Sequence, residues 1–200
     1  RIGYAGGAFD LFHVGRLNVL KHARSSCDHL VAGVVSDEVL FANSVQVFDK
    51  ASSAGRPFFA HIMTTSNHRP FTYPDGRIDI KSPGGREGGV KYTDYAIGTF
   101  IAEARTRPWF DDTLFIITAD HCASVAGKTR LPVGSYRIPL IMYSPALVAP
   151  GLNTRLASQI DIPPTILALL GAAGDDHFFG QGLSEQLFDT PGAIARIWRS

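Results

Sequence analysis

Short apolar runs of strand length, separated by helical patterns, constrain the fold of this chain more than any other feature. The runs cover residues 1–7, 29–35, 57–65, 113–119 and 138–144. Nearly continuous apolar runs of this length are typical of strands covered on both faces, as in parallel sheets. Helices are predicted at 17–24, 36–54, 90–105 and from Asp161 onward. Alternating strands and helices predict an α/β, three-layer sandwich around a mostly parallel, doubly wound sheet, with ligands at strand C-terminal ends.

Local signals set the expected helix boundaries. Ser36 before two acidic residues predicts an N-cap, and Gly55 is expected to end that helix. Asp161 is predicted to cap the last helix, which Gly171 would end. The polar stretch 66–87 is rich in Pro, Gly and Arg, and a loop of that length inside a compact domain is usually functional or mobile.

The composition excludes several classes of function. The 200 residues are 45% hydrophobic and 18% charged, with 19 Lys+Arg against 18 Asp+Glu. This balance gives no electrostatic case for nucleic acid, and no run approaches the roughly 18 apolar residues of a membrane span. The chain opens without Met, which suggests a fragment. Without a span or signal, a cytoplasmic location is the default expectation.

The first motif, GGAFDLFHVGR at 6–16, lies between a predicted strand and a predicted helix. Backbone N–H groups at such a turn suit a phosphate, and a histidine there can donate to phosphate oxygens. The segment resembles the opening of the cytidylyltransferase family, G-T-F-D-x-x-H-x-G-H, and the resemblance continues through CDHLVAGVVSDE at 27–38. It implies CTP binding, with the following nucleotide-binding residues: Gly6, Gly7, Phe9, Asp10, His13 and Arg16.

Two departures from that family are visible. Arg16 stands where the signature has its second histidine; arginine keeps a positive charge but lacks a neutral form. After about Ala42 the resemblance stops, and the family's Ile-Ser-Thr-Thr segment is not found. The segment 1–42 is therefore interpreted either as a nucleotide-binding β-α-β unit or as one whose loop binds nothing.

The second motif is Asp120-His121, which directly follows the apolar run 113–119. A carboxylate oxygen and an imidazole nitrogen at a strand end are suitable ligands for a divalent metal. Five segments surround or include this pair in order: FFAHIMTTSNHRPFTYP (58–74), GREGGVKYTDYAIGTFI (85–101), ITADHCAS (117–124), IPLIMYSP (138–145) and SQIDIPPTILALLG (158–171).

Together these segments resemble the C-terminal half of the sulfatase-like phosphoglycerol transferases, the lipoteichoic acid synthase family of the alkaline phosphatase superfamily, over about residues 45–190. The resemblance implies that Asp120 and His121 hold Mn²⁺, with Mg²⁺ as the alternative. It also implies that His68, assisted by Arg69, contacts the phosphate of a glycerophosphate group. The implied substrates are small phosphate or sulfate esters, and the family's catalytic domain is membrane-anchored outside the cell.

The family's nucleophile has no counterpart in the printed residues. A metal-activated threonine or a modified cysteine takes the phosphoglycerol or sulfuryl group in that family. Neither Cys27 nor Cys122 fits the Cys/Ser-x-Pro-x-Arg pattern of sulfatases, and Thr64 and Thr65 do not match the nucleophile segment. We therefore expect the module to be incomplete and inactive alone.

Other candidate residues are better explained by packing. His61 is expected to be a core histidine on a buried strand, and His177 a packed surface residue. Asp94 and Tyr95 are expected to serve helix packing and surface hydrogen bonding.

The two resemblances meet between about residues 40 and 47, which predicts a chimera of segments 1–42 and 43–200 packed as one domain. A gene fusion, a decayed gene, an assembly error and a designed sequence all fit this pattern. Three functions remain open: an incomplete sulfatase-like transferase or hydrolase, a CTP-binding protein, and a non-catalytic α/β module.

Overall fold

The computed structural model describes residues 2–6, 29–33, 36–122, 136–146, 148, 150–152, 156–169 and 178–183. The chain divides into two compact units, Arg1–Phe110 and Asp111–Ser200. Each unit is described by itself below. No helix among the described ranges has the length and apolar character needed to cross a membrane.

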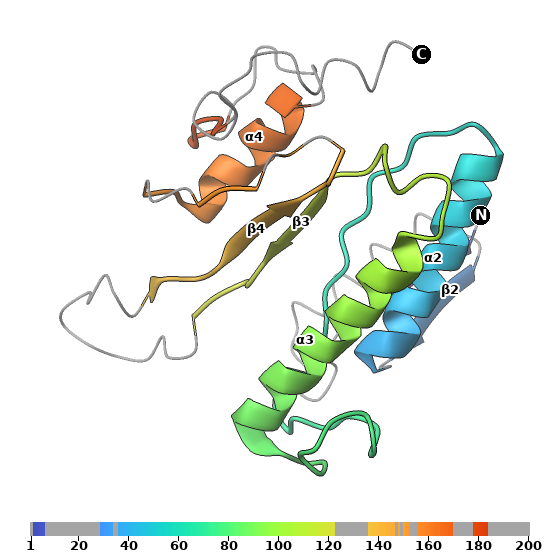
Figure 1. The fold of residues 1–200 in the computed structure, drawn as a ribbon, viewed down its shortest axis with the longest axis vertical. Coiled ribbons are helices and arrows are strands. Elements are labelled where there is room, and N and C mark those ends of the chain that lie inside the picture. Colours follow the sequence, from blue (N-terminus) through green and yellow to red (C-terminus); the bar gives the residue numbers. More distant parts are fainter. Residues whose placement is uncertain are drawn as a thin grey trace. The chain divides into compact units, whose positions relative to one another are not determined.

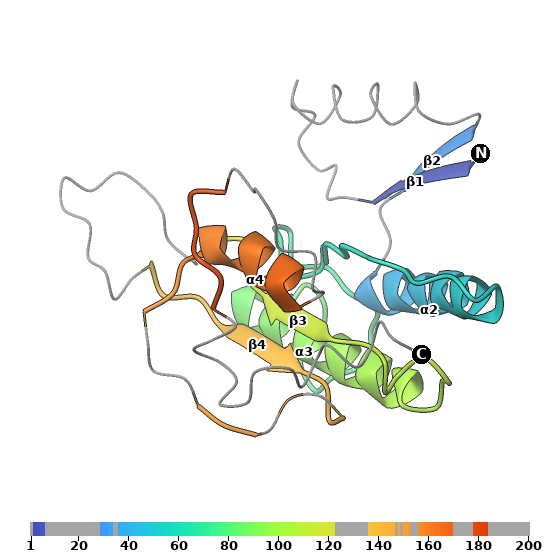
Figure 2. The same cartoon turned by 90° about the horizontal axis from the view of Figure 1, so that it is seen from above.

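The first unit begins with a parallel strand pair. Strands β1 (Ile2–Gly6) and β2 (His29–Gly33) pair from Ile2↔His29 to Gly6↔Gly33, as Figure 2 shows. This confirms the two predicted strands and their parallel pairing. The predicted helix 17–24 lies outside the described residues.

Two long helices form the core of the first unit (Figure 1). Helix α2 covers Asp37–Ser53 and helix α3 covers Gly85–Ala104. On α2 the buried apolar residues recur at helical spacing, at Phe41, Val45 and Phe48. The ring of Phe41 stacks on that of Phe100 from α3, with centroids 4.7 Å apart. Helix α2 confirms the prediction to within one residue at each end, and α3 begins five residues earlier than predicted.

The prediction of a strand over residues 57–65 is wrong. These residues have no regular structure, and Phe59 is 76% exposed. Only part of the segment is anchored: the Phe58 ring stacks on Phe48, with centroids 4.5 Å apart. The N–H of Thr65 donates to a side-chain carboxylate rather than to a neighbouring strand. His61, expected in the core, is exposed for the same reason, because no strand fixes one face of the segment inward.

The second unit contains an antiparallel strand pair. Strands β3 (Phe115–Thr118) and β4 (Leu140–Tyr143) pair from Phe115↔Tyr143 to Thr118↔Leu140. Both strands were predicted, within a sheet expected to be mostly parallel, whereas this pair is antiparallel. A parallel neighbour needs a crossover connection, usually a helix, and no helical pattern was found between these two runs. One described strand pair is thus parallel and the other antiparallel, and the doubly wound sheet remains a prediction.

A 3₁₀ turn precedes the last described helix, which itself begins where it was predicted. The 3₁₀ turn η2 (Gln159–Asp161) leads into α4 (Ile162–Leu169). Ser158 is the N-cap residue, and its N–H donates to the Asp161 carboxylate at 2.8 Å. Asp161 is therefore the carboxylate of a capping box around η2, and it directly precedes α4, where the cap was predicted. The expected stop at Gly171 lies outside the described residues.

Candidate functional site

His68 lies in a tight loop, residues 65–71, called the 65–71 loop below. The His68 N–H donates to the Thr65 carbonyl at 3.0 Å, and the Phe71 N–H donates to the His68 carbonyl at 2.7 Å. The imidazole Nδ1 lies 2.9 Å from the Arg69 carbonyl oxygen. Because a carbonyl only accepts, this contact requires the proton on Nδ1. The His68 ring is exposed and accessible to a ligand.

A buried carboxylate holds the start of this loop. Asp37, in the first turn of α2, is 0% exposed. Its Oδ1 accepts the N–H groups of Thr65 at 2.9 Å and Ser66 at 3.0 Å. Its Oδ2 accepts the Thr93 hydroxyl from α3 at 2.9 Å. A buried carboxylate needs such partners, since an unpaired one would be very costly to desolvate.

Glycines on α3 let the 65–71 loop approach the helix closely. A Cβ on Gly89 would lie 3.0 Å from the Phe71 ring and 3.2 Å from the Ser66 carbonyl oxygen. A Cβ on Gly88 would collide with the Tyr73 hydroxyl. The loop therefore packs against backbone where any other residue would present a side chain.

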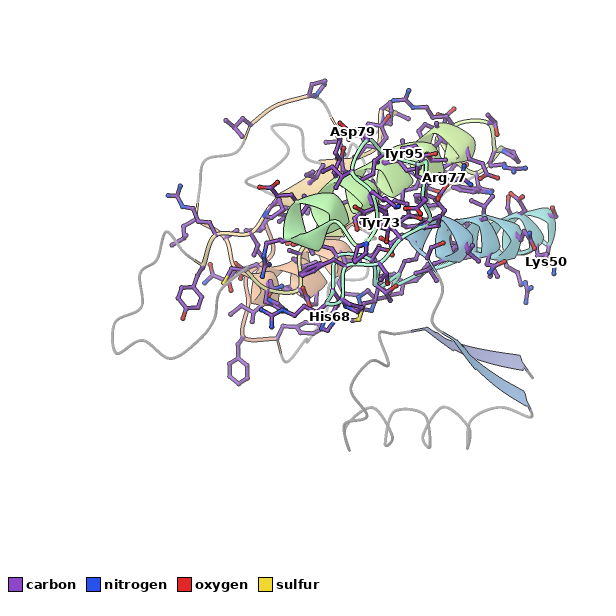
Figure 3. The ribbon with its side chains drawn as sticks, turned by 90° about the horizontal axis from the view of Figure 1, so that it is seen from below. Lys50, His68, Tyr73, Arg77, Asp79 and Tyr95 are labelled. Carbon is purple, nitrogen blue, oxygen red and sulfur yellow. The ribbon has the colours of Figure 1, made fainter. Side chains whose placement is uncertain are left out.

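A polar network fixes the segment that follows the loop. The Tyr92 hydroxyl donates to Glu38 Oε2 at 2.8 Å, and Arg77 Nε lies 3.2 Å from the same oxygen. Tyr92 is 0% exposed and stacks on Tyr73, with centroids 5.0 Å apart. Burial, together with the Glu38 charge, raises the pKa of Tyr92 to about 12. Figure 3 labels Tyr73 and Arg77 beside α3.

In the second unit, Asp120 and His121 immediately follow β3 and the single residue Ala119. The His121 N–H donates to Asp120 Oδ1 at 2.9 Å. His121 Nδ1 lies 2.7 Å from the Cys122 carbonyl oxygen, which requires a proton on Nδ1; in the neutral ring Nε2 then carries the lone pair. That Nε2 lies 3.5 Å from Asp120 Oδ2, and the two side chains are 62% and 73% exposed.

A distant side chain braces this pair. Gln159 Nε2 donates to the carbonyl oxygens of Ala119 and Asp120, each at 2.8 Å. Since η2 carries Gln159, the start of the last helix is tied to the main chain that carries the pair.

The pair fits part of a metal site. A metal-binding histidine usually donates its second ring N–H to a carbonyl or carboxylate, as His121 does to Cys122. A separation of 3.5 Å between Nε2 and Oδ2 is compatible with two bonds of roughly 2.0–2.2 Å to one ion. Among the described residues no group of three or more His, Cys, Asp or Glu side chains gathers, so the pair supplies two ligands.

The structure brings Asp120 and His121 together in one unit, and it places His68 and Arg69 side by side in the other. The predicted nucleotide-binding segment is described only at the backbone of Gly6, the last residue of β1. The other nucleotide-binding residues predicted in that segment lie outside the described residues: Gly7, Phe9, Asp10, His13 and Arg16. His177 lies outside them as well.

Sequence reasoning missed three residues around these positions. Asp37 was taken only as a helix-starting acid, and Gln159 was not singled out. Arg86 is the third: its guanidinium lies over the Phe71 ring, 5.8 Å from the centroid. No local pattern identifies such residues, because their partners lie far away in the sequence. Tyr95 lies against Tyr92 with centroids 6.2 Å apart, as expected for helix packing.

A sulfatase family model matches residues 8–172, so the chain belongs to the sulfatase family. The match includes His68, Asp120 and His121, and it begins inside segment 1–42. It gives no support for a separate cytidylyltransferase origin of that segment, and the similarity extends well before residue 45.

Individual relatives agree with this family. The chain is 26% identical over 170 residues to lipoteichoic acid synthase 1 of Bacillus subtilis, covering 74% of this chain and 26% of that protein. It is 26% identical over 166 residues to phosphoglycerol transferase I of Xanthomonas euvesicatoria pv. vesicatoria, covering 78% and 23%. The chain thus spans about a quarter of the length of these curated relatives.

A solved structure extends the comparison to the fold. The chain resembles the crystal structure of an alkaline phosphatase superfamily protein from Vibrio parahaemolyticus, with a TM-score of 0.75 and 34% identity. The likeness covers 92% of this chain and 47% of that protein. It confirms the α/β class and the superfamily that the ordered segments implied.

Proposed function

We propose that this chain is the part of a metal-dependent phosphoglycerol transferase, or of a phosphate or sulfate ester hydrolase, that supplies two metal ligands and a phosphate contact. The observation that carries this proposal is the Asp120–His121 pair after β3. Its carboxylate oxygen and imidazole nitrogen lie 3.5 Å apart, and the other imidazole nitrogen is engaged by a carbonyl. The names of the relatives support a glycerophosphate head group as the substrate.

Asp120 Oδ2 and His121 Nε2 would be the metal ligands. A mixed oxygen and nitrogen set favours Mn²⁺ over Mg²⁺, which prefers oxygen ligands only. A bound divalent ion would act as a Lewis acid on the ester oxygens. The Cys122 carbonyl keeps the His121 ring in the tautomer that presents Nε2, and Gln159 holds the backbone of Asp120 in place.

His68 would contact the substrate phosphate or sulfate. With Nδ1–H donated to the Arg69 carbonyl, Nε2 can donate to an anion only when the imidazole is protonated. The charged ring then also attracts the anion, and Arg69 adds a second positive charge. The anion contact at His68 and the metal pair are proposed separately, each within its own unit. The family's nucleophile has no match among these residues. We expect no turnover by the 200 residues alone.

Mn²⁺ binding tests the metal half of the proposal directly. Electron paramagnetic resonance of free Mn²⁺ during titration gives the dissociation constant without any activity assay. We expect Asp120→Ala and His121→Ala each to weaken binding by at least about tenfold, because each removes one of two ligands. Asp111→Ala is the matched control, since Asp111 is an exposed acid of the same unit outside the pair.

Two outcomes would contradict the metal assignment. One is Mn²⁺ binding that is equally strong in the wild type and in Asp120→Ala, which would place the ion elsewhere. The other is no Mn²⁺ binding up to millimolar concentration. A titration with Mg²⁺ alongside distinguishes the two candidate ions.

A further inference from the structure

We infer that Asp37 is the positioning residue of the 65–71 loop: its carboxylate fixes the backbone that presents His68 to the substrate anion. The inference rests on the proposed function for the role of His68, and on the structure alone for the geometry of the loop. Neither the family match nor the named relatives assign a role to Asp37. From the sequence alone, Asp37 is an ordinary acidic residue in the first turn of a helix.

The first step of the argument is that the contact is made with backbone. Asp37 Oδ1 accepts two successive N–H groups, those of Thr65 and Ser66, at 2.9 and 3.0 Å. Two bonds to adjacent peptides fix both the position and the direction of the chain. His68 follows two residues later, and its own N–H closes back on the Thr65 carbonyl at 3.0 Å. The peptide between Thr65 and Ser66 therefore links the two contacts: its N–H donates to Asp37, and its carbonyl accepts from the His68 N–H.

The second step is that the carboxylate itself is held. Asp37 Oδ2 accepts the Thr93 hydroxyl of α3 at 2.9 Å, so the loop is tied to both helices through one side chain. The group is 0% exposed, and charge-assisted bonds in a buried setting are about twice as strong as neutral ones. Ser66 as a whole residue is only 4% exposed, so water has little access to replace these bonds.

The third step is that the loop packs closely against a glycine of α3. The Ser66 carbonyl and the Phe71 ring lie against Gly89, where a Cβ would come within 3.2 and 3.0 Å. Asp37 thus binds the start of the loop to α2, and Ser66 and Phe71 pack against Gly89 of α3. Figure 3 shows His68 well away from Lys50, which lies in the last turn of α2, at the opposite end from Asp37.

The same helix offers a matched control. Asp49, near the C-terminal end of α2, also accepts from two partners: Trp109 Nε1 at 2.7 Å and Arg107 at 3.4 Å. Its partners lie outside the 65–71 loop. Substitution of Asp49 should cost stability, as substitution of Asp37 should, without moving His68.

The experiment compares wild type, Asp37→Ala, Asp37→Asn and Asp49→Ala as the full 200-residue chain. Amide hydrogen exchange of Thr65 and Ser66, and the His68 ring signals, are followed by NMR. Inorganic sulfate is the probe ligand, because its charge is constant between pH 5 and 8. We expect Asp37→Ala to accelerate exchange at Thr65 and Ser66, shift the His68 ring signals, and weaken sulfate binding by on the order of tenfold.

The variants separate positioning from stability. Asp37→Asn retains an acceptor oxygen for the two N–H groups but loses the charge, so its effects should be intermediate. Asp49→Ala should lower the melting temperature while leaving the His68 signals and sulfate affinity as in wild type. If Asp37→Ala fails to fold, Asp37→Asn and Thr93→Val carry the same comparison.

The inference is overturned if the Asp37 variants leave Thr65 and Ser66 exchange and the His68 signals like those of Asp49→Ala. Failure of the proposed function is a different result: wild type would then show protected amides but no sulfate binding. In that case the exchange data still decide whether Asp37 fixes the loop, and the substrate role of His68 is withdrawn.

Discussion

The two candidate regions are held in place by opposite kinds of side chain. In the first unit, the buried, charged Asp37 accepts from two backbone N–H groups before His68. In the second unit, the exposed, neutral Gln159 donates to two backbone carbonyls at Asp120. Buried bonds to charge are worth about 1.5–3 kcal/mol, against about 0.5–1.5 for neutral ones. The anion contact is thus held firmly, and the metal pair more loosely.

This difference fits the chemistry proposed for each region. A histidine that contacts an anion gets its geometry from the protein, so the protein must fix it in advance. A metal pair gains part of its order from the ion itself, since binding free energy also organises the ligands. The exposed Asp120 and His121 side chains therefore need less support than the 65–71 loop.

The largest effect that tests this comparison is expected at Gly89, where the 65–71 loop packs against α3. Gly89→Ala should lower the free energy of unfolding by about 1–3 kcal/mol, because its Cβ meets the Ser66 carbonyl and the Phe71 ring. It should also shift the amide signals of the 65–71 loop. Urea denaturation and NMR measure both effects.

Gly98→Ala is the control on the same helix. A Cβ there has nothing within 4 Å, so alanine should stabilise the chain by about 0.5–1 kcal/mol through helix propensity. Equal effects of the two substitutions would show that the loop does not rest tightly on α3.

A smaller effect is expected at the Tyr92–Glu38 bond. Tyr92→Phe should lower the free energy of unfolding at pH 7 by about 1–2 kcal/mol, because it removes a buried bond to a carboxylate. The pH dependence follows from the folded-state pKa of about 12, which lies above the ordinary value of 10.0. This contribution is complete below pH 10 and is lost as the pH rises towards 12.

Denaturation curves between pH 8 and 11.5 check this prediction. The wild type should lose stability faster than Tyr92→Phe above pH 10. Parallel curves for the two proteins would mean that Tyr92 is not the group that titrates.

The smallest effect is expected at the brace of the metal pair. Gln159→Ala removes two exposed, neutral hydrogen bonds, so the free energy of unfolding should fall by about 0.5–1 kcal/mol. Mn²⁺ affinity should fall by only about two- to threefold, since both ligands remain. A loss as large as that of Asp120→Ala would show that the pair depends on its brace as strongly as His68 depends on Asp37.

Local features of the sequence predicted local structure well. Ser36, the two acidic residues after it and Gly55 predicted α2 to within one residue at each end, because helix start and stop signals act over a few residues. Ser36 is the N-cap residue, although its side chain makes no capping hydrogen bond. Asp120 and His121 are adjacent in the sequence and follow a strand, so their proximity needed no knowledge of the fold. The five ordered segments also led to the correct superfamily.

The cytidylyltransferase interpretation rests on one local motif, and the comparisons give it no support. A glycine-rich turn after a strand has the same physical cause in many α/β proteins, so a single loop says little about ancestry. The sulfatase match from residue 8 to residue 172 covers the loop and the later segments together.

By itself, the sequence determined the three helices α2, α3 and α4, most of the described strands, the family and the two candidate groups of residues. The tertiary structure decided what holds those groups: Asp37 meets a backbone 28 and 29 residues away, and Gln159 meets one 39 and 40 residues away. It also decided that residues 57–65 form no strand and that β3 and β4 run antiparallel. The physical reason is that periodicity records which residues avoid water, whereas hydrogen bonds between distant segments depend on how the chain returns on itself.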